Sequence, residues 1–262
     1  MGDKTIIAWT DHTQNFWMGC SAVSPGCEKC YMFAAQERYG RDPFRVTRTG
    51  GSIWKQPARW NAEARAEGKR HRVFTCSWSD FFHRDADAWR GDAWDIIKRT
   101  PYLDYQILTK RPGRIREHLP VDWGTGYPNV WLGVSVESRE WLWRLNTLRE
   151  IPATVRFVSF EPLLESVAPM NLAGIHWAIV GGESGPGFRP MDHQWAREIR
   201  DASRASGTAF FFKQSAAART EMGIALLEAD GSSRVIREYP LSHSVAAVNI
   251  PTPIIAPSPS LF

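Results

Sequence analysis

Six short apolar runs recur along the chain, and each run ends in polar residues. They cover residues 72–80, 105–112, 130–138, 155–162, 177–184 and 209–214. Continuous apolar runs of this length are typical of strands that are covered on both faces, as in a parallel sheet. The sequence therefore predicts six buried strands.

The segments between these runs show helical periodicity. Apolar residues share one helix face in three sets, which are Trp89, Ala93, Ile96 and Ile97; Trp141, Leu145 and Leu148; and Trp195, Ile199 and Ala202. We expect caps at Asp85 or Asp87, at Ser138 and at Asp192, with Gly207 closing the third helix. Alternating strands and helices indicate βαβ units with right-handed crossovers, so the fold is a doubly wound sheet or a full or partial barrel.

The chain length of 262 residues suits one large domain. The alternating pattern ends at Gln214, so we expect the barrel in residues 1–214 and an extension in residues 215–262. Within that extension, residues 223–240 predict a small hairpin around Asp230-Gly231, and residues 250–262 form a Pro-rich tail.

The sequence shows no feature of export or membrane insertion. No apolar run approaches the roughly 20 residues of a membrane span, and the first residues lack the pattern of a signal peptide. We therefore expect a cytoplasmic protein. Four cysteines are too few for a disulfide scaffold in a chain of this length, and their clustering indicates metal binding or catalysis.

Polar residues follow nearly every predicted strand. They are Ser77, Ser79 and Asp80; Thr109, Lys110 and Arg111; Ser135 and Glu137; Ser159 and Glu161; Gly182, Glu183 and Ser184; and Lys213 and Gln214. In parallel α/β folds the loops after the strands build the active site. Any one of these residues could be a helix cap, but their recurrence predicts a functional site at this end of the sheet.

The strongest motif is GCSAVSPGCEKCY at residues 19–31, with the cysteine spacing C-x6-C-x2-C. The Ser24-Pro25-Gly26 turn could fold the longer gap so that Cys20 joins Cys27 and Cys30 at one metal centre. A four-iron cluster normally takes four cysteine ligands, so three leave one iron open for a ligand that is not protein.

Cys76 leaves the nature of the metal site open. As a fourth ligand it would close the site into a structural zinc site or an inert cluster, and the chain would be a zinc-stabilised nucleic-acid-binding protein or a redox or sensing iron-sulfur protein. A single Cys at the end of a strand is more often a small buried residue. For His12 and His83 we expect hydrogen-bonding or solvent roles.

Basic residues crowd the stretch from 38 to 72. They are Arg38, Arg41, Arg45, Arg48, Lys55, Arg59, Arg65, Lys69, Arg70 and Arg72. Trp54 and Trp60 are interleaved with them, which favours a groove that neutralises phosphates and stacks bases. The alternative is a solvated basic face without a partner.

Together these motifs resemble a known family. The segments WTD (9–11), GC…SPGCEKCY (19–31), SWSDFF (77–82), ILTKRP (107–112), WLGVSVE (131–137), RFVSFEPLL (156–164), WAIVGGESGPG (177–187) and FFFKQ (210–214) resemble the three-cysteine phage protein family, a phage protein domain of unknown function. That family looks like a divergent branch of the radical S-adenosylmethionine (SAM) superfamily.

The resemblance implies a partial (β/α)6-type TIM barrel of the radical SAM kind, with a small C-terminal extension. It implies a [4Fe-4S] cluster on Cys20, Cys27 and Cys30, with SAM bound at the open iron and cleaved to a 5′-deoxyadenosyl radical. An electron donor similar to flavodoxin or ferredoxin would supply the electron.

By analogy with the superfamily, the strand-end residues divide into groups. Ser77, Ser79 and Asp80 would hold the methionine end of SAM; Ser135 and Glu137 the ribose; and Gly181, Gly182 and Glu183 the adenine side. Thr109, Lys110, Glu161 and Lys213 would contact the substrate or the SAM carboxylate, and the last three are the candidate catalytic residues.

The chain also departs from the superfamily's usual pattern. The first cysteine gap is six residues instead of three, Lys29 replaces the aromatic residue before the last cysteine, and the Gly-Gly-Glu sequence follows a later strand. The expected substrate is a nucleic-acid base or nucleotide, and a phage origin in a bacterial host favours hypermodification of thymidine in DNA. Peptide and small-metabolite substrates remain open, as does the oligomeric state.

Overall fold

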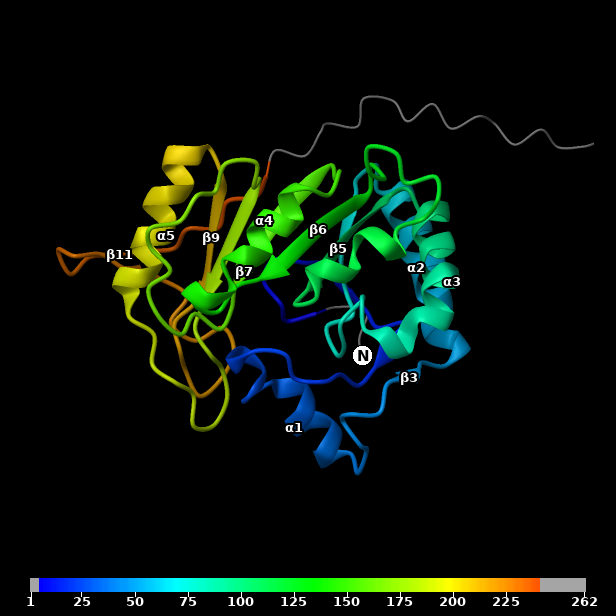
Figure 1. The fold of residues 1–262 in the computed structure, drawn as a ribbon, viewed down its shortest axis with the longest axis horizontal. Coiled ribbons are helices and arrows are strands. Elements are labelled where there is room, and N and C mark those ends of the chain that lie inside the picture. Colours follow the sequence, from blue (N-terminus) through cyan, green and yellow to red (C-terminus); the bar gives the residue numbers. More distant parts are fainter. Residues whose placement is uncertain (1–4, 241–262) are drawn as a thin grey trace, which may run out of the picture.

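A seven-stranded parallel sheet curls into a half-barrel in the computed structural model, which describes residues 5–240 (Figure 1). Its strands are, in spatial order, β1 (His12–Gln14), β4 (His71–Thr75), β5 (Leu103–Thr109), β6 (Val130–Ser135), β7 (Val155–Phe160), β8 (Trp177–Gly181) and β9 (Ala209–Gln214). The six strands predicted from apolar runs are all present, and the predicted partial TIM barrel is confirmed. The seventh strand, β1, has three residues and no apolar run, so its sequence gave no strand signal.

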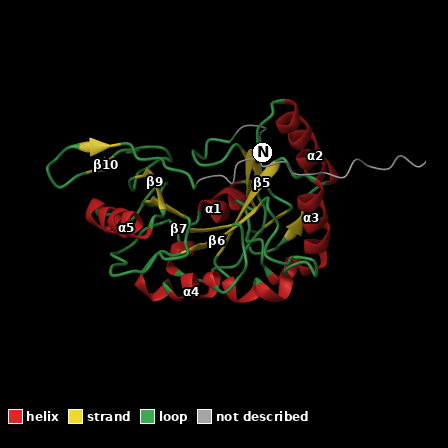
Figure 2. Cartoon of the chain, turned by 90° about the horizontal axis from the view of Figure 1, so that it is seen from above, coloured by secondary structure: helices red, strands yellow, loops and turns green. Residues whose placement is uncertain are grey.

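Four helices cover the outer face of the sheet, as the view from above shows (Figure 2). They are α2 (Gly51–Ala66), α3 (Asp87–Arg99), α4 (Trp143–Arg149) and α5 (His193–Ser206). A fifth helix, α1 (Tyr31–Arg38), lies beyond the carboxyl ends of the strands in Figure 1 and inside the arc of the sheet in the view from above (Figure 2). Short 3-10 turns, among them η1 (Pro25–Cys27) and η2 (Arg84–Ala86), complete the connections.

The third predicted helix has the expected caps. Asp192 accepts a hydrogen bond from the Gln194 amide at 2.7 Å, and Gly207 ends α5 with a left-handed φ of 67°. The cap predicted at Asp85 or Asp87 is wrong, because α3 begins at Asp87 and the residue at its N-cap position is Ala86, which makes no side-chain hydrogen bond. The His83 ring instead caps the preceding turn η2, where it accepts the Asp85 amide hydrogen bond at 3.2 Å. Ser138 makes no capping hydrogen bond through its side chain.

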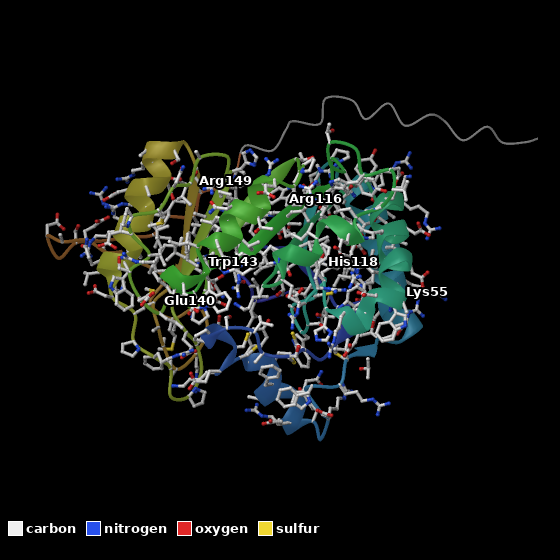
Figure 3. The ribbon with its side chains drawn as sticks, viewed as in Figure 1. Lys55, Arg116, His118, Glu140, Trp143 and Arg149 are labelled. Carbon is white, nitrogen blue, oxygen red and sulfur yellow. The ribbon has the colours of Figure 1, made fainter. Side chains whose placement is uncertain are left out.

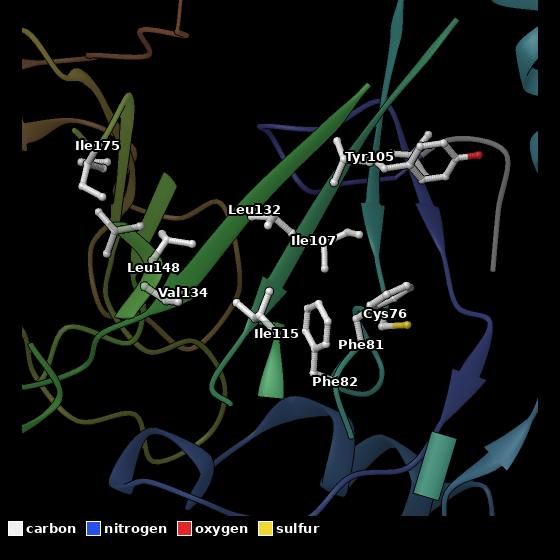
Figure 4. Packing of buried hydrophobic residues seen from close by; sticks show 14 of the residues in the cluster. Cys76, Phe81, Phe82, Tyr105, Ile107, Ile115, Leu132, Val134, Leu148 and Ile175 are labelled. Atoms are coloured by element: carbon white, nitrogen blue, oxygen red, sulfur yellow. The ribbon is translucent and has the colours of Figure 1, made fainter. Parts of the chain in front are cut away.

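The core consists of two apolar layers, one on each face of the sheet. The outer layer lies between strands and helices, where Ile107, Leu132 and Val134 pack against Ile115 and Phe82 (Figure 4). The inner layer fills the amino end of the half-barrel with buried aromatic residues, among them Trp9, Phe74, Trp131, Phe157, Trp177 and Phe211. Full burial of such a side chain contributes about 1.5–3 kcal/mol, so these layers stabilise the barrel and leave its carboxyl end free for polar residues.

The groove predicted around Trp54 and Trp60 is wrong. Trp60 is fully buried and Trp54 is 8% exposed, because both belong to the apolar face of α2. Arg70 pairs with Asp104 and Arg72 pairs with Asp11 at the amino end of β4. These residues therefore stabilise the fold and offer no stacking surface.

The chain after β9 returns to the barrel. The predicted hairpin is confirmed by β10 (Leu226–Leu227) and β11 (Ser233–Arg234), which pair antiparallel. Further on, the Trp177 indole donates to the Glu238 carbonyl at 2.9 Å, and the Tyr239 hydroxyl donates to the Ala8 carbonyl at 3.1 Å. These bonds tie the extension to the amino end of the half-barrel, while the predicted Pro-rich tail at 250–262 lies outside the described residues.

Within residues 5–240, no helix combines the length and the apolar character that a bilayer crossing requires.

Candidate metal and cofactor site

The loop that carries Cys20, Cys27 and Cys30 lies across the carboxyl end of the half-barrel, next to α1 (Figure 1). The segment after β4 fixes both ends of this loop. Ser79 donates from its hydroxyl to the Gly19 carbonyl at 2.5 Å, and Tyr31 donates to the Ser77 carbonyl at 2.5 Å.

A buried ion pair between Asp80 and Arg111 supports Cys20. Asp80 is 5% exposed and accepts hydrogen bonds from the Thr109 hydroxyl at 2.7 Å, the Lys110 amide at 3.0 Å and the Arg111 guanidinium at 3.0 Å. The same guanidinium lies 3.7 Å from the Cys20 sulfur and donates to the Ser21 carbonyl at 2.8 Å. Asp80 thus fixes the backbone at the end of β5, and Arg111 links this strand end to the cysteine loop.

Glu137 lies beneath the middle of the cysteine loop, and its side chain is fully buried. It pairs with Lys110 and, at 3.0 Å, with Arg144, and it accepts a hydrogen bond from the Ser24 hydroxyl at 2.8 Å. A Cβ atom on Gly26 would lie 2.4 Å from the Glu137 Cγ atom, so only glycine allows the turn to approach this closely. Burial raises the pKa of Glu137, but Lys110 and Arg144 outweigh it, and the pKa lies below its usual value.

Arg189 holds the loop from the opposite side of the barrel. It donates to Glu183 at 3.0 Å, to the Pro25 carbonyl at 3.2 Å and to Glu28 at 3.1 Å. Glu183 follows β8 and is 6% exposed. Residues from the ends of β4, β5, β6 and β8 therefore all contact the cysteine loop or its supports.

A cavity of about 760 Å³ opens beneath the loop. All three loop cysteines line it, together with the candidate residues Ser77, Ser79, Asp80, Thr109, Lys110, Ser135, Glu161, Gly182, Glu183 and Lys213. Two other candidates, Glu137 and Gly181, do not line it. Since a cavity of several hundred Å³ suits a small ligand, the predicted residues converge on a site large enough for a cofactor.

The cavity has a polar wall and an apolar floor. On the polar wall Lys213 pairs with Glu161 at 3.0 Å, and Ser159 donates to Glu161 at 3.0 Å. Gly181 lies directly behind this pair, since a Cβ atom there would lie 2.7 Å from a Glu161 oxygen. Trp9, Phe74 and Leu108 form the floor. This combination suits a ligand with one charged end and one flat apolar part.

The segment after β9 contributes a rim that the sequence analysis did not identify. A Cβ atom on Gly182 would lie 2.1 Å from the Ala216 amide nitrogen, so glycine lets the two backbones meet. Gln214 accepts hydrogen bonds from the Thr220 hydroxyl and the Glu221 amide. As a result Ala218, Arg219 and Thr220 line the cavity.

Cys76 differs from the three loop cysteines in its surroundings. Its side chain is 2% exposed and packs in the outer core near Phe81 (Figure 4). Burial raises the pKa of the Cys76 thiol. Cys76 therefore has the character of a small buried residue, as the sequence analysis favoured, although it also borders the cavity.

The arrangement of the loop cysteines bears on the kind of metal group that they could hold. Within residues 5–240, no three His, Cys, Asp or Glu side chains stand close enough to hold a single metal ion. Ligands of a four-iron cluster bind different irons, so three thiols spread along one loop fit a cluster better than a lone ion. Burial, with the nearby Asp80 carboxylate, raises the pKa of Cys20 to about 12 although Arg111 lowers it, so metal binding must release the thiol proton.

The sequence analysis named Arg111 among the strand-end residues but missed Arg144 and Arg189, and it assigned no contact to any of the three. Arg111, Arg144 and Arg189 each join a strand end to the cysteine loop or to Glu137. Arg111 lies in the strand-end segment that was singled out, but its direction toward Cys20 depends on the tertiary fold. Arg189 lies 164 residues from Pro25, and no local pattern could have linked them.

The fold and the site define a class: a partial (β/α) barrel that carries a three-cysteine loop over a cofactor-sized cavity. The chain belongs to the family described as "Protein of unknown function (DUF5131)", which matches residues 4–239. No curated protein matches the chain in sequence. The resemblance to the three-cysteine phage proteins stays a prediction, because the matched family carries no activity or source in its description.

Several solved structures of spore photoproduct lyase are similar to this chain. A cysteine-to-serine mutant is 15% identical with a TM-score of 0.47, and a double mutant with bound AdoMet and dinucleoside spore photoproduct is 14% identical with a TM-score of 0.46. Each covers 75% of this chain, and this chain spans 62% of each of theirs. These values describe a distant likeness, and no residue role is taken from it.

Proposed function

We propose that the chain is a radical SAM enzyme that modifies a nucleic-acid base or nucleotide. In this proposal Cys20, Cys27 and Cys30 hold a [4Fe-4S] cluster, and SAM occupies the adjoining cavity. When bound, the cluster and SAM supply a 5′-deoxyadenosyl radical that abstracts a hydrogen atom from the substrate.

One observation carries the proposal: three cysteines on one braced loop line a cofactor-sized cavity, while Cys76, which also borders the cavity, lies outside that loop and is packed in the core with 2% exposure. A reactive cluster needs an open iron, which three protein ligands leave and four do not. The bracing by Ser79, Arg111 and Arg189 supports the proposal further, because a cluster site must be held in a defined geometry.

The candidate residues would have different roles in the cavity. Ser77, Ser79, Thr109, Ser135, Gly182 and Glu183 would contact SAM from the lining, while Asp80, Glu137 and Gly181 would shape the site through the neighbours that they hold. Lys110, Glu161 and Lys213 would orient the substrate or the SAM carboxylate. The apolar floor of Trp9, Phe74 and Leu108 would exclude water from the reacting atoms.

Finer assignments belong to the same proposal. Residues 1–214 would form the catalytic barrel and residues 215–262 its extension. An electron donor of the flavodoxin or ferredoxin kind would reduce the cluster. Hypermodification of thymidine in phage DNA, by rearrangement of a side chain on the base, is the specific reaction that we propose.

The test is formation of 5′-deoxyadenosine by the anaerobic, reduced protein in the presence of SAM. We expect the product with the native chain and with Cys76→Ala, but not with Cys27→Ala, because only the second change removes a cluster ligand. Cys76→Ala is the matched control, since it makes the same Cys-to-Ala change at a cysteine outside the loop.

Three results would contradict the proposal. They are absence of the product from a fully reconstituted enzyme given candidate substrates, a colourless protein with one zinc per chain, and loss of the cluster in Cys76→Ala. The second would support the zinc-stabilised binding protein, and the third the four-cysteine redox or sensing protein.

A further inference from the structure

Two aromatic rings are exposed on the segment between the cysteine loop and β3 (Thr47–Arg48). The side chains of Tyr39 and Phe44 are 66% and 60% exposed. Rings of this size are usually buried, so two exposed rings five residues apart in one segment indicate a binding surface. Together with Arg38, Arg41 and Arg45 they define what we call the α1 face.

The arginines of the α1 face are exposed and are not held in ion pairs within the described residues. Arg38, Arg41 and Arg45 are all exposed, and in the described part of the chain their side chains form no ion pair or hydrogen bond. Two carboxylates, Glu37 and Asp42, lie in the same segment, and Asp42 accepts the Phe44 amide hydrogen bond at 2.9 Å. The face therefore keeps an excess of positive charge that suits a polyanion.

The two exposed rings lead to the cavity. Tyr39 stacks near Trp78, with ring centroids 6.4 Å apart and an interplanar angle of 26°. Phe44 packs on Phe33 with centroids 5.1 Å apart. Trp78 and Phe33 both line the cavity, so each exposed ring begins a short aromatic path to the site.

We propose that the α1 face binds a single-stranded nucleic acid and delivers one of its bases to the cavity. The inference rests on the proposed function and names its substrate as a strand and not a free nucleotide. Flat rings interleaved with arginines are how proteins hold single strands, since the rings stack on bases and the cations contact phosphates.

A second exposed aromatic surface lacks this combination. Trp143 is 46% exposed at the start of α4, on the outer, helix-covered side, where Figure 3 also labels Arg149 and Arg116. There Arg149 donates to the Ala173 carbonyl at 2.9 Å, and Arg116 donates to the Glu150 carbonyl at 2.9 Å. An acidic electron donor could also use the arginines of the α1 face, but it would not need rings that continue into the cavity. The strand is therefore the favoured occupant.

The experiment measures binding of a fluorescent 12-nucleotide DNA strand to the full, anaerobically purified chain at several salt concentrations. We expect Tyr39→Ala/Phe44→Ala to raise the Kd by roughly tenfold or more. Replacing Arg38, Arg41 and Arg45 by Gln should lower the slope of log K against log salt by about 2. Trp143→Ala is the matched control for the aromatic variant. The change of Lys55, Arg99 and Arg234 to Gln is the matched control for the arginine variant, because it removes the same three positive charges. Both controls should bind the strand like the native chain.

Tyr39→Ala alone provides a second variant, because it leaves the loop around Phe44 intact. The inference is overturned if the native chain does not bind the strand, or if the α1-face variants bind no worse than their controls. It is also overturned if these variants lose binding of an acidic flavodoxin while strand binding is unchanged. Strand binding without SAM cleavage would overturn the proposed function and leave only the strand-binding part of this inference, whereas SAM cleavage without strand binding would overturn this inference and leave the proposed function.

Discussion

Glu137 joins the cysteine loop to the barrel, because its carboxylate contacts both Ser24 in the loop and Arg144 in α4. Its fully buried carboxylate is shared by Lys110, Arg144 and Ser24. A buried charge is tolerated only while its partners are in place, and removing one partner leaves the other as an uncompensated charge in the interior. The Arg144 side chain is also fully buried, so this pair has no access to solvent.

Glu137→Gln is expected to lower the free energy of unfolding by about 3 kcal/mol, because the Arg144 charge loses its counterion. Urea unfolding of the cluster-free chain measures the change without a contribution from iron. The nearby exposed Glu140 (Figure 3) provides the control, since Glu140→Gln should shift the free energy by less than about 0.5 kcal/mol. Equal effects of the two variants would contradict the role given to Glu137.

The same carboxylate predicts a pH dependence. Although burial raises its pKa, Lys110 and Arg144 keep the pKa of Glu137 below the 4.5 of an unfolded chain. The unfolded state therefore takes up a proton first as the pH falls, and the stabilisation present above pH 4.5 is lost as the pH falls through the folded-state pKa. Between pH 6 and pH 3 the native chain should lose more stability than Glu137→Gln; parallel losses would show that Glu137 does not carry this dependence.

At the scale of elements, the site is a loop held by the ends of several strands. Ser79 after β4, Arg111 after β5 and Glu137 after β6 contact the loop from below, while Arg189 contacts it from the side of β8. Parallel strands bring their carboxyl ends to one edge, so residues far apart in the chain meet there.

The close approach of Gly182 to Ala216 provides a test of this arrangement. Gly182→Ala should cost about 1–3 kcal/mol of stability, because the new methyl group meets backbone that cannot yield without moving residues 215–220. Gly91→Ala in α3 is the matched control, since a Cβ atom there meets open space and alanine favours a helix by about 1 kcal/mol over glycine. Thermal unfolding compares the two; a neutral Gly182→Ala would show that the rim is not held by this contact.

The elements differ in how far the sequence could predict them. The strands from β4 to β9 were predictable because continuous apolar runs reflect burial on both faces. In contrast, β1 is too short for a periodic signal, and α2 contains Pro57 and begins at Gly51, both poor helix formers. The burial of Trp54 and Trp60 stabilises α2, and this tertiary packing could not be read from the basic residues around them.

The sequence could indicate where the strand-end residues gather, but not which side chains contact one another. The polar residues after the strands line one cavity, as the rule for parallel sheets predicts. Partners from distant segments decide which of these side chains face the cavity. Glu137 contacts Arg144 and Ser24, whereas Lys213 and Glu161 pair within the cavity. Such choices follow from packing and charge pairing, not from local sequence.

At the scale of the whole molecule, the two ends of the half-barrel differ in the residues that they carry. Aromatic residues and the returning segment at Glu238 and Tyr239 close the amino end. The carboxyl end carries the cysteine loop, the cavity and the α1 face. Apolar packing is therefore concentrated toward the amino end of the barrel axis, and the candidate site lies at the carboxyl end.

The central claim is that three thiolates hold a four-iron cluster with one iron open. Mössbauer spectroscopy of the anaerobic, iron-57-loaded Cys76→Ala protein tests it most directly, with and without SAM. The account predicts about four irons per chain, one of which changes its signal when SAM is added. Loss of the iron from this variant, or a cluster whose irons all ignore SAM, would contradict it.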